Sequence, residues 1–178
     1  MSSLLLLSGG IDSALCLYSE QDIKLAVGFD YGQPHVIELT RAEALAESMG
    51  VPFRRVELPA IPKVDDVVFA GRNAVFLSVA TAIAASEGIG TVIIGCNKDD
   101  FDLFPDCRLD FIRGMNAALA AYSVHVYAPL LNMTKVDVVK AALVAGIKHG
   151  ETWTCYSPDS SLPCGTCLAC RNMEVASV

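Results

Sequence analysis

The sequence has few basic residues and no long apolar run. Lys and Arg together number 13, against 20 Asp and Glu, which gives a formal net charge of -7. Because nucleic acids are bound mainly through cations that neutralise phosphates, this balance argues against direct nucleic-acid binding. The run Leu4-Leu5-Leu6-Leu7 is short and follows no basic segment, so it predicts neither a signal peptide nor a membrane span. We expect a cytoplasmic protein with reduced cysteines.

Length and hydrophobic content predict one compact domain. The 178 residues lie in the usual range for a single domain, and 53% hydrophobic residues supply enough apolar surface for a core. The sequence contains no internal repeat and no low-complexity linker. A single domain over residues 1–178 is therefore expected.

Short apolar segments alternate with segments of helical periodicity. The pattern predicts strands at residues 4–7, 23–29, 53–58, 91–95 and 124–127, and helices at 13–20, 35–49, 73–87, 107–121 and 134–145. Several strands are apolar on both faces, which is typical of a parallel sheet covered by helices on both sides. Thr134-Lys135-Val136-Asp137 matches a capping box and Gly146 a helix stop. The expected fold class is α/β, Rossmann-like, with ligands at the carboxyl ends of the strands.

Ser8-Gly9-Gly10-Ile11-Asp12-Ser13 joins the first predicted strand to the first predicted helix. Glycines allow a sharp turn, and serine hydroxyls and helix-start amides donate to anions, so we expect a phosphate or pyrophosphate site. The segment lacks the Gly-Lys-Ser/Thr ending of a Walker loop and the third glycine of a dinucleotide fingerprint. It resembles the Ser-Gly-Gly-x-Asp-Ser loop of the PP-loop ATP pyrophosphatases, which cleave ATP between its α and β phosphates. A glycine-rich turn without a chemical role is the alternative.

Four of the seven cysteines lie near the C-terminus. Cys155, Cys164, Cys167 and Cys170 form the pattern C-x8-C-x2-C-x2-C. Cysteines separated by two residues place two sulfurs within reach of one tetrahedral ion, so segment 152–172 predicts a zinc site with these four ligands. Four thiolates leave no position for water, so the zinc would be structural. An iron–sulfur cluster and disulfides are the alternatives, and a reducing compartment disfavours the disulfides.

These features occur together with further segments that resemble a known family. The sequence is similar to the 7-cyano-7-deazaguanine synthases, a QueC-like branch of the PP-loop ATP pyrophosphatases. Besides the loop at 8–13, the matching segments are Gly28-Phe29-Asp30-Tyr31-Gly32-Gln33, Gly71-Arg72-Asn73, Asp100 with Phe104-Pro105-Asp106-Cys107-Arg108, Pro129-Leu130 with Thr134-Lys135, and Thr154-Cys155-Tyr156 with Cys164, Cys167 and Cys170. They extend along the whole chain.

The resemblance implies an ATP-dependent carbon–nitrogen ligase. Such an enzyme converts 7-carboxy-7-deazaguanine and ammonia first to an amide and then, with a second ATP, to the nitrile. A carboxylate is a poor acyl donor, and transfer to AMP gives it a good leaving group while pyrophosphate departs into the glycine loop. Electrostatic positioning of the phosphates would be the main catalytic contribution. The implied cofactors are ATP, Mg2+ and structural Zn2+.

The resemblance also implies residue roles at the phosphates. The expected pyrophosphate ligands are Ser8, Gly9, Gly10, Asp12 and Ser13. Asp12 is expected either to act through Mg2+ or to serve as a plain N-cap of the first helix. Arg72 and Lys135 are expected to neutralise phosphate charge and to form the catalytic set with Asp12.

Further residues are expected at the base and the sugar. Asp30 and Tyr31 follow the second predicted strand and would contact ribose or adenine. The candidate substrate-binding residues are Asn73, Asp100, Phe104, Asp106 and Arg108. An aspartate would pair with the guanidine-like edge of the deazaguanine, and Arg108 would meet its carboxylate. A solvated acidic loop is the alternative for the aspartates.

The chain departs from the family pattern at several positions. Family members usually have Arg where this chain has Pro34, and Gly-Tyr where it has Leu103-Phe104, and the stretch 58–72 is shorter than usual. These differences leave open a relative that stops at the amide, or one that joins the deazaguanine carboxylate to a protein amine in phage DNA modification or antiphage defence. The acidic charge argues against a tRNA sulfurtransferase, and the intact loop argues against an inactive binding module. A homodimer that covers apolar surface is expected.

Overall fold

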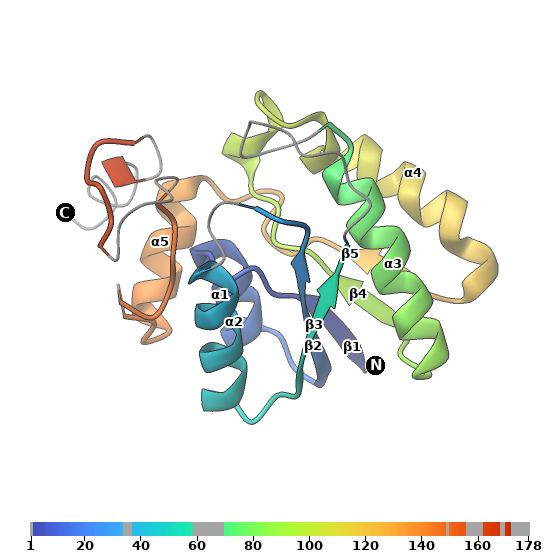
Figure 1. The fold of residues 1–178 in the computed structure, drawn as a ribbon. Helices are drawn as coiled ribbons and strands as arrows, with labels where there is room; N and C mark the ends of the chain where they lie inside the picture. Colours follow the sequence, from blue (N-terminus) through green and yellow to red (C-terminus); the bar gives the residue numbers. More distant parts are fainter. Residues whose placement is uncertain are drawn as a thin grey trace.

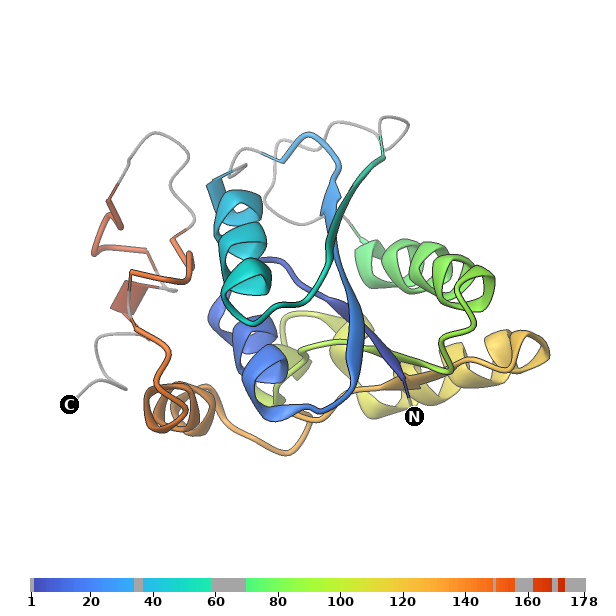
Figure 2. The same cartoon turned by 90° about the horizontal axis from the view of Figure 1, so that it is seen from below.

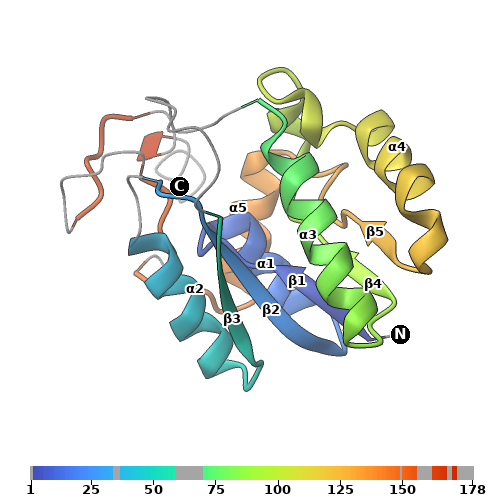
Figure 3. The same cartoon turned by 45° about the vertical axis from the view of Figure 1, so that its right-hand side comes forward.

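The computed structural model describes residues 2–33, 37–58, 70–148, 150–155, 162–167 and 170–171. Within these residues, five parallel strands form one sheet: β1 (Ser3–Leu6), β2 (Ile23–Asp30), β3 (Phe53–Glu57), β4 (Thr91–Ile93) and β5 (His125–Tyr127). The strand order is β3-β2-β1-β4-β5, as Figure 3 shows. The chain builds outward from β1 in both directions, so a crevice opens beyond the carboxyl ends of β1 and β4, where such folds bind ligands.

Helices cover both faces of the sheet. One layer contains α1 (Ile11–Ser19), α2 (Ile37–Ser48) and α5 (Lys135–Val144), and the other contains α3 (Arg72–Ser86) and α4 (Leu109–Leu119). Figures 1 and 2 show these two layers on opposite sides of the strands.

Alternation along β1 explains how the two layers bury one sheet. Leu5 packs into the cluster under α1, α2 and α5, whereas Leu4 and Leu6 pack into the cluster under α3 and α4. Successive side chains of a strand point to opposite faces, so an all-leucine strand serves both cores. Together with the parallel strand pairs, this confirms the α/β expectation.

Each predicted strand and helix is present, with shifted ends. The helix predicted at 107–121 begins only at Leu109, because a 3-10 turn at Pro105–Cys107 precedes it. The capping box is present, since the Thr134 hydroxyl accepts from Asp137 N and the Asp137 carboxylate accepts from Thr134 N. Gly146 has φ of +89°, which stops α5 as expected.

The outer edge of β5 is closed by a side chain from α4. Asn116 Nδ2 donates to Val126 O at 2.9 Å, and Asn116 Oδ1 accepts from Val126 N at 2.7 Å. The flanking residues of this strand face β4, where Tyr127 O accepts from Ile94 N and His125 N donates to Gly90 O. The Asn116 amide therefore takes the place of a sixth strand at this residue.

The described cysteine-rich segment lies on the side of α1, α2 and α5 (Figures 1 and 2). Trp153, Cys155 and Cys170 are buried together and pack against Ile37 at the start of α2. Among the described helices, none has the length and apolarity that crossing a membrane requires.

Candidate active site and metal centre

The loop between β1 and α1 is held by its own hydroxyl groups. Ser13 Oγ donates to Gly10 O at 3.0 Å and accepts from Ser8 N at 3.2 Å. Ser8 Oγ lies 3.2 Å from Ser13 Oγ and accepts from Gly10 N at 3.2 Å. The two hydroxyls therefore fix the loop at the N-terminus of α1, where backbone amides and the helix dipole favour an anion.

Gly9 is locked between α2 and the cysteine-rich segment. Its φ is +90°, and a Cβ at this position would lie 2.0 Å from Glu38 O. Gly9 O accepts a hydrogen bond of 2.9 Å from Trp153 N. A side chain is therefore excluded at Gly9 both by backbone conformation and by contact with backbone.

Asp12 is not the N-cap of α1, so the N-cap alternative is wrong. Gly10 occupies the cap position, and Asp12 lies inside the first turn. Its Oδ2 forms an ion pair with Lys135 Nζ, and its Oδ1 accepts a 2.9 Å bond from Asn97 Nδ2. The chain thus brings together two of the three expected catalytic residues, 123 positions apart in sequence.

Asn97, which the sequence analysis did not single out, connects this pair to the acidic loop after β4. Its side chain is fully buried, and its Nδ2 also donates to Asp100 Oδ2 at 2.8 Å. Asn97 Oδ1 accepts from Asp99 N, whose carboxylate accepts from Lys135 N at 2.8 Å. We call Asp12, Asn97, Asp100 and Lys135 the Asp12 network. A usable signal was the position of Asn97 in the loop that follows the buried strand β4, where ligand-binding residues gather.

Like charges meet in the Asp12 network. Burial, and then the nearby carboxylate of Asp12, raise the pKa of Asp100 above its ordinary value, although Asn97 and Lys135 oppose the shift. Gly95 makes this proximity possible, because a Cβ there would lie 3.1 Å from Asp12 C. Two carboxylates held beside one amide favour a cation between them.

A second polar group lies on the β2 side of the site. Arg72 Nη1 donates to the Tyr31 hydroxyl at 3.3 Å, and the Arg72 guanidinium carbon lies 5.9 Å from the centre of the Phe76 ring. Arg72 Nε is buried and has no hydrogen-bond partner among the described residues. Burial raises the pKa of Glu38 to about 7, although Arg72 and then Gln33 lower it. We call Tyr31, Glu38 and Arg72 the Arg72 group.

Both groups face one cavity of about 310 Å³ at the carboxyl ends of the strands. That volume lies within the range of small-molecule sites. Ten residues expected at the nucleotide and substrate line it: Ser8, Gly10, Asp12, Ser13, Tyr31, Arg72, Asn73, Asp100, Phe104 and Lys135. Cys155, expected as a metal ligand, lines it too. Glu38, Asn97 and Trp153 line it as well and were not singled out from sequence. The Ser8–Ser13 loop therefore opens into the same cavity as both polar groups.

The remaining residues expected at the nucleotide and substrate do not line the cavity. Asp30 forms an ion pair with Arg55 on β3. Asp106 Oδ2 accepts from Asn73 N at 3.0 Å, and Arg108 Nε donates to Phe101 O at 2.7 Å. Gly9 is part of the loop but packs against the backbone of α2 and does not line the cavity. These contacts place Asp106 behind Asn73 and hold Arg108 across the acidic loop.

One of the departures from the family pattern, Leu103-Phe104, lies at the cavity. Leu103 and Phe104 both line it, and Leu103 is 63% exposed. Pro34 and most of the stretch 58–72 lie outside the described residues. The structure thus places the Leu103-Phe104 change, but not the other two, at the candidate active site.

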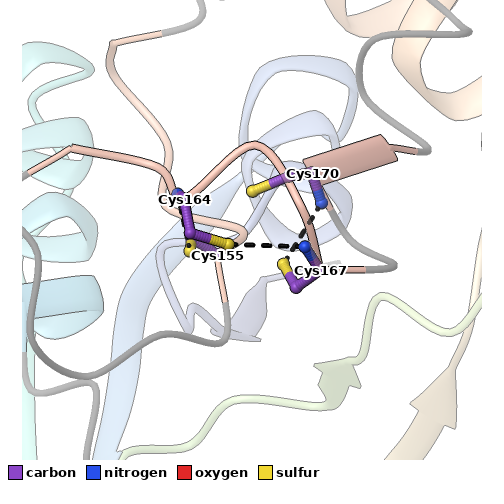
Figure 4. A group of neighbouring side chains, drawn as sticks. All are labelled: Cys155, Cys164, Cys167 and Cys170. Atoms are coloured by element: carbon purple, nitrogen blue, oxygen red, sulfur yellow. Dashed lines mark hydrogen bonds between the residues drawn. The ribbon is translucent and has the colours of Figure 1, made fainter.

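Cys155, Cys164, Cys167 and Cys170 come together as the sequence predicts. Figure 4 shows the four side chains gathered at one point, and their sulfurs all lie within 4.8 Å of one another. Four thiolates about 2.3 Å from one zinc ion would stand about 4 Å apart, so this donor set fits a single tetrahedral ion. Cysteines of an iron–sulfur cluster bind different irons, which calls for a wider spacing.

Backbone amides support the sulfur atoms. Cys164 N donates to Cys155 Sγ at 3.3 Å, and Cys167 N to Cys164 Sγ at 3.4 Å. Hydrogen bonds, first that of the Thr166 hydroxyl, lower the pKa of Cys164 to about 5, whereas burial raises the pKa of Cys170 to about 12. A bound cation favours the thiolate form that ligation needs.

Solved structures share this fold. The U34-tRNA thiolase NcsA from Methanococcus maripaludis, described with its [4Fe-4S] cluster, superposes with a TM-score of 0.65 at 16% identity, covering 99% of this chain and 64% of that one. The NH3-dependent NAD synthetase from Campylobacter jejuni gives 0.58 at 19% identity, covering 82% and 64%. At these identities the likeness concerns the fold alone.

Sequence comparison identifies the family. The model described as "Queuosine biosynthesis protein QueC" matches residues 2–70 and 62–176. A 7-cyano-7-deazaguanine synthase from Novosphingobium aromaticivorans is 36% identical over 95% of this chain and 86% of its own length. The synthase of Kineococcus radiotolerans is 33% identical over 94% and 89%. The chain therefore belongs to the QueC family of queuosine biosynthesis proteins.

Proposed function

We propose that this chain is an ATP-dependent ligase that converts 7-carboxy-7-deazaguanine and ammonia to 7-cyano-7-deazaguanine. The observation that carries the proposal is the opening of the Ser8–Ser13 loop into a cavity with cationic residues on two sides, Lys135 and Arg72. Near-full-length similarity to 7-cyano-7-deazaguanine synthases selects this reaction among those of PP-loop folds. It also favours the nitrile product over the amide or a protein conjugate.

The charge arrangement suits the transfer of AMP from ATP to the substrate carboxylate. The loop would hold the pyrophosphate that leaves, while Lys135 and Arg72 would offset the negative charge that gathers on the phosphates. Ammonia then displaces AMP from the acyl group, and a second adenylation, on the amide oxygen, permits loss of AMP to leave the nitrile. Placing both reactants in one cavity removes much of the entropic cost of the encounter.

Mg2+ fits the Asp12 network. Asp12 Oδ1 and Asp100 Oδ2 accept from the same Asn97 nitrogen at 2.9 and 2.8 Å, so two carboxylates converge there. The ion would supply positive charge against the phosphates. Asp12 would then hold Mg2+ while Lys135 remains its neighbour.

For the deazaguanine we propose Asn73, Asp100 and Phe104, which line the cavity. Asp106 would act through Asn73, whose backbone and side-chain amides it accepts from. Tyr31 would contact the nucleoside. Arg108 and Asp30 would reach a ligand only by leaving their present partners, Phe101 O and Arg55.

We propose that the four-cysteine site holds structural zinc. The support is the single-ion spacing of the sulfurs and the contact of Trp153 with both the cysteines and the loop through Gly9. Elemental analysis of protein purified without added metal should give about one zinc per chain. Removal with a chelator should lower the melting temperature, and iron with sulfide instead of zinc would contradict the assignment.

We further propose a cytoplasmic homodimer. Leu143 and Val144, at the end of α5, are 41% and 90% exposed, which supports an apolar contact surface. Sedimentation of the wild-type chain and of Val144→Asp checks this, with a dimer expected only for the wild type if this end of α5 lies in the interface.

The reaction is tested by mass spectrometry of the protein incubated with 7-carboxy-7-deazaguanine, ATP, Mg2+ and ammonium. Nitrile with about two AMP per product is expected, because two adenylations are needed. Amide as the final product would show an enzyme that stops early. Acyl-adenylate without either product would indicate another amine acceptor, and no substrate-dependent AMP would refute the ligase proposal.

A further inference from the structure

Glu38 is a carboxylate on the cavity wall that the steps above do not use. It lies in the first turn of α2, and its carbonyl oxygen occupies the space that a Cβ on Gly9 would fill. The backbone of Glu38 is therefore fixed against the pyrophosphate loop. Its side chain lines the cavity together with Ser8 and Gly10 of that loop.

The charged and titratable neighbours of Glu38 come from two other elements. Arg72 at the start of α3 and the Tyr31 hydroxyl after β2 interact with its carboxylate electrostatically, and Gln33 supplies a hydrogen bond. Trp153, from the opposite side of the loop, is neutral. Glu38 makes no ion pair within 4.0 Å among the described residues.

The proposed reaction requires a proton acceptor near the acyl-adenylate. At neutral pH simple amines are protonated, and a protonated nitrogen has no lone pair with which to attack carbon. The acceptor must be an ionised group that is not already assigned to another ligand or cation. Asp12 is paired with Lys135 and Asn97, and Asp100 is proposed for the deazaguanine and is bonded to Asn97. Asp99, which also lines the cavity, accepts from Lys135 N.

Resting on the proposed function, we propose that Glu38 is the catalytic base that takes a proton from ammonium inside the cavity. Ammonium and the Glu38 carboxylate give ammonia and the neutral carboxylic acid. The nitrogen lone pair then forms the C–N bond as the C–O bond to AMP breaks. The remaining surplus proton on nitrogen passes to a phosphate oxygen of the departing AMP, so charge and atoms balance.

The environment of Glu38 suits this role. Burial places its pKa at about 7, so it is substantially ionised at neutral pH and a stronger base than an exposed carboxylate. Among the described residues that line the cavity there is no histidine to compete. A carboxylate also attracts ammonium by charge, which combines binding with deprotonation.

Glu38→Gln separates the proton transfer from the other steps, because glutamine keeps the shape and loses the charge. Amide formation from ammonium should fall about 10²- to 10⁴-fold, as is usual when a general base is removed. Substrate-dependent pyrophosphate exchange should stay within about 3-fold, since no ammonium takes part. Glu43→Gln, at an exposed position of the same helix, is the matched control and should match the wild type in both assays.

Two substrates sharpen the test. Hydroxylamine is largely unprotonated at neutral pH, so Glu38→Gln should still form the hydroxamate. The amide, supplied directly with ATP, should still give nitrile, because ammonium does not enter that step. Amide formation from ammonium in the wild type should rise as Glu38 ionises and level off above pH 7. In the variant, which depends on free ammonia, it should keep rising with pH and show no such levelling.

Three results would overturn the assignment. One is ammonium-dependent amide formation by Glu38→Gln at the wild-type rate. Another is an equal loss of hydroxamate, or of nitrile from supplied amide, which would indicate a purely positioning role. The third is loss of pyrophosphate exchange in the variant. If the wild type itself gives no pyrophosphate exchange with the deazaguanine acid, the failure lies instead with the proposed function.

Discussion

The two polar walls of the cavity differ in how their charges are satisfied. In the Asp12 network, Asp12 meets Lys135 and Asn97, and Asn97 bonds to Asp100. In the Arg72 group, Arg72 Nε has no hydrogen-bond partner among the described residues, and Glu38 has a raised pKa. One wall is internally paired, and the other carries a buried N–H of Arg72 with no partner among the described residues and a carboxyl whose pKa is raised by burial.

This difference suggests which residues contribute to stability and which to ligand binding. A buried network whose members bond to one another stabilises the fold, and removing one member leaves the rest unsatisfied. Buried groups without partners cost stability and are expected where a ligand supplies what is missing. Changes to the Asp12 network should therefore reduce both stability and activity, whereas changes to the Arg72 group should reduce activity without reducing stability.

Gly9→Ala should have the largest effect, because the Ser8–Ser13 loop packs at Gly9 against the backbone of α2, the helix that carries Glu38 of the Arg72 group. The new Cβ would meet Glu38 O at 2.0 Å, and the backbone would be strained at φ of +90°. We expect more than about 3 kcal/mol of destabilisation and loss of ATP binding, measured by denaturant unfolding and calorimetry.

Gly50→Ala is the control for Gly9→Ala. Its φ of +65° imposes similar backbone strain, but a Cβ there meets nothing within 4 Å. We expect a cost of about 1 to 2 kcal/mol with ATP binding unchanged. Equal effects of the two substitutions would show that the contact between the loop and α2 is unimportant.

Lys135→Ala should come next, because it leaves the Asp12 carboxylate without its cation. We expect a fall in kcat/KM of about 10²- to 10³-fold, the usual effect of removing one charge-stabilising group. Stability should also fall, by about 1 to 3 kcal/mol. Lys140→Ala, at an exposed position of the same helix, should change neither quantity. If Lys135→Ala lost activity but kept the wild-type free energy of unfolding, the stabilising role of the network would be contradicted.

Arg72→Gln should reduce kcat/KM about 10²-fold and leave the free energy of unfolding within about 1 kcal/mol of the wild type. The reason is that a partly buried cation with an unmet N–H is removed. Steady-state kinetics and denaturant unfolding check both halves. Destabilisation as large as that of Lys135→Ala would remove the contrast between the two walls.

The last prediction is a pH dependence of stability that comes from Glu38. Since the pKa of Glu38 is about 7 in the folded state, above its ordinary value, the stabilisation of its neutral form is fully present at low pH and lost as pH rises through 7. Glu38→Gln should therefore match the wild type most closely below about pH 5 and be more stable near pH 8, by up to about 3 kcal/mol for a shift of this size. Identical curves for the two proteins would show that burial does not perturb this carboxyl.

The sequence predicted the fold more completely than the site. The apolar strand segments, the Ser8–Ser13 loop and the cysteine spacings can each be recognised from residues that are close together in the sequence. Asn97 and Glu38 were missed because their importance comes from burial and from partners distant in sequence, such as Asp12 and Gly9. Asp30 is the last residue of β2, at a strand end where binding residues gather, yet it forms an ion pair with Arg55 on the neighbouring strand. Such pairing across strands is not visible in a linear pattern.

The side-chain amide of Asn116 blocks one way in which molecules of this protein could associate, the addition of a strand at β5. An open strand edge invites another chain to add to the sheet, which is a common route to aggregation. Here the outward N–H and C=O of Val126 are already bonded to one side chain. A strand from another molecule could pair with β5 only after displacing that side chain, so a single asparagine disfavours polymerisation through this edge.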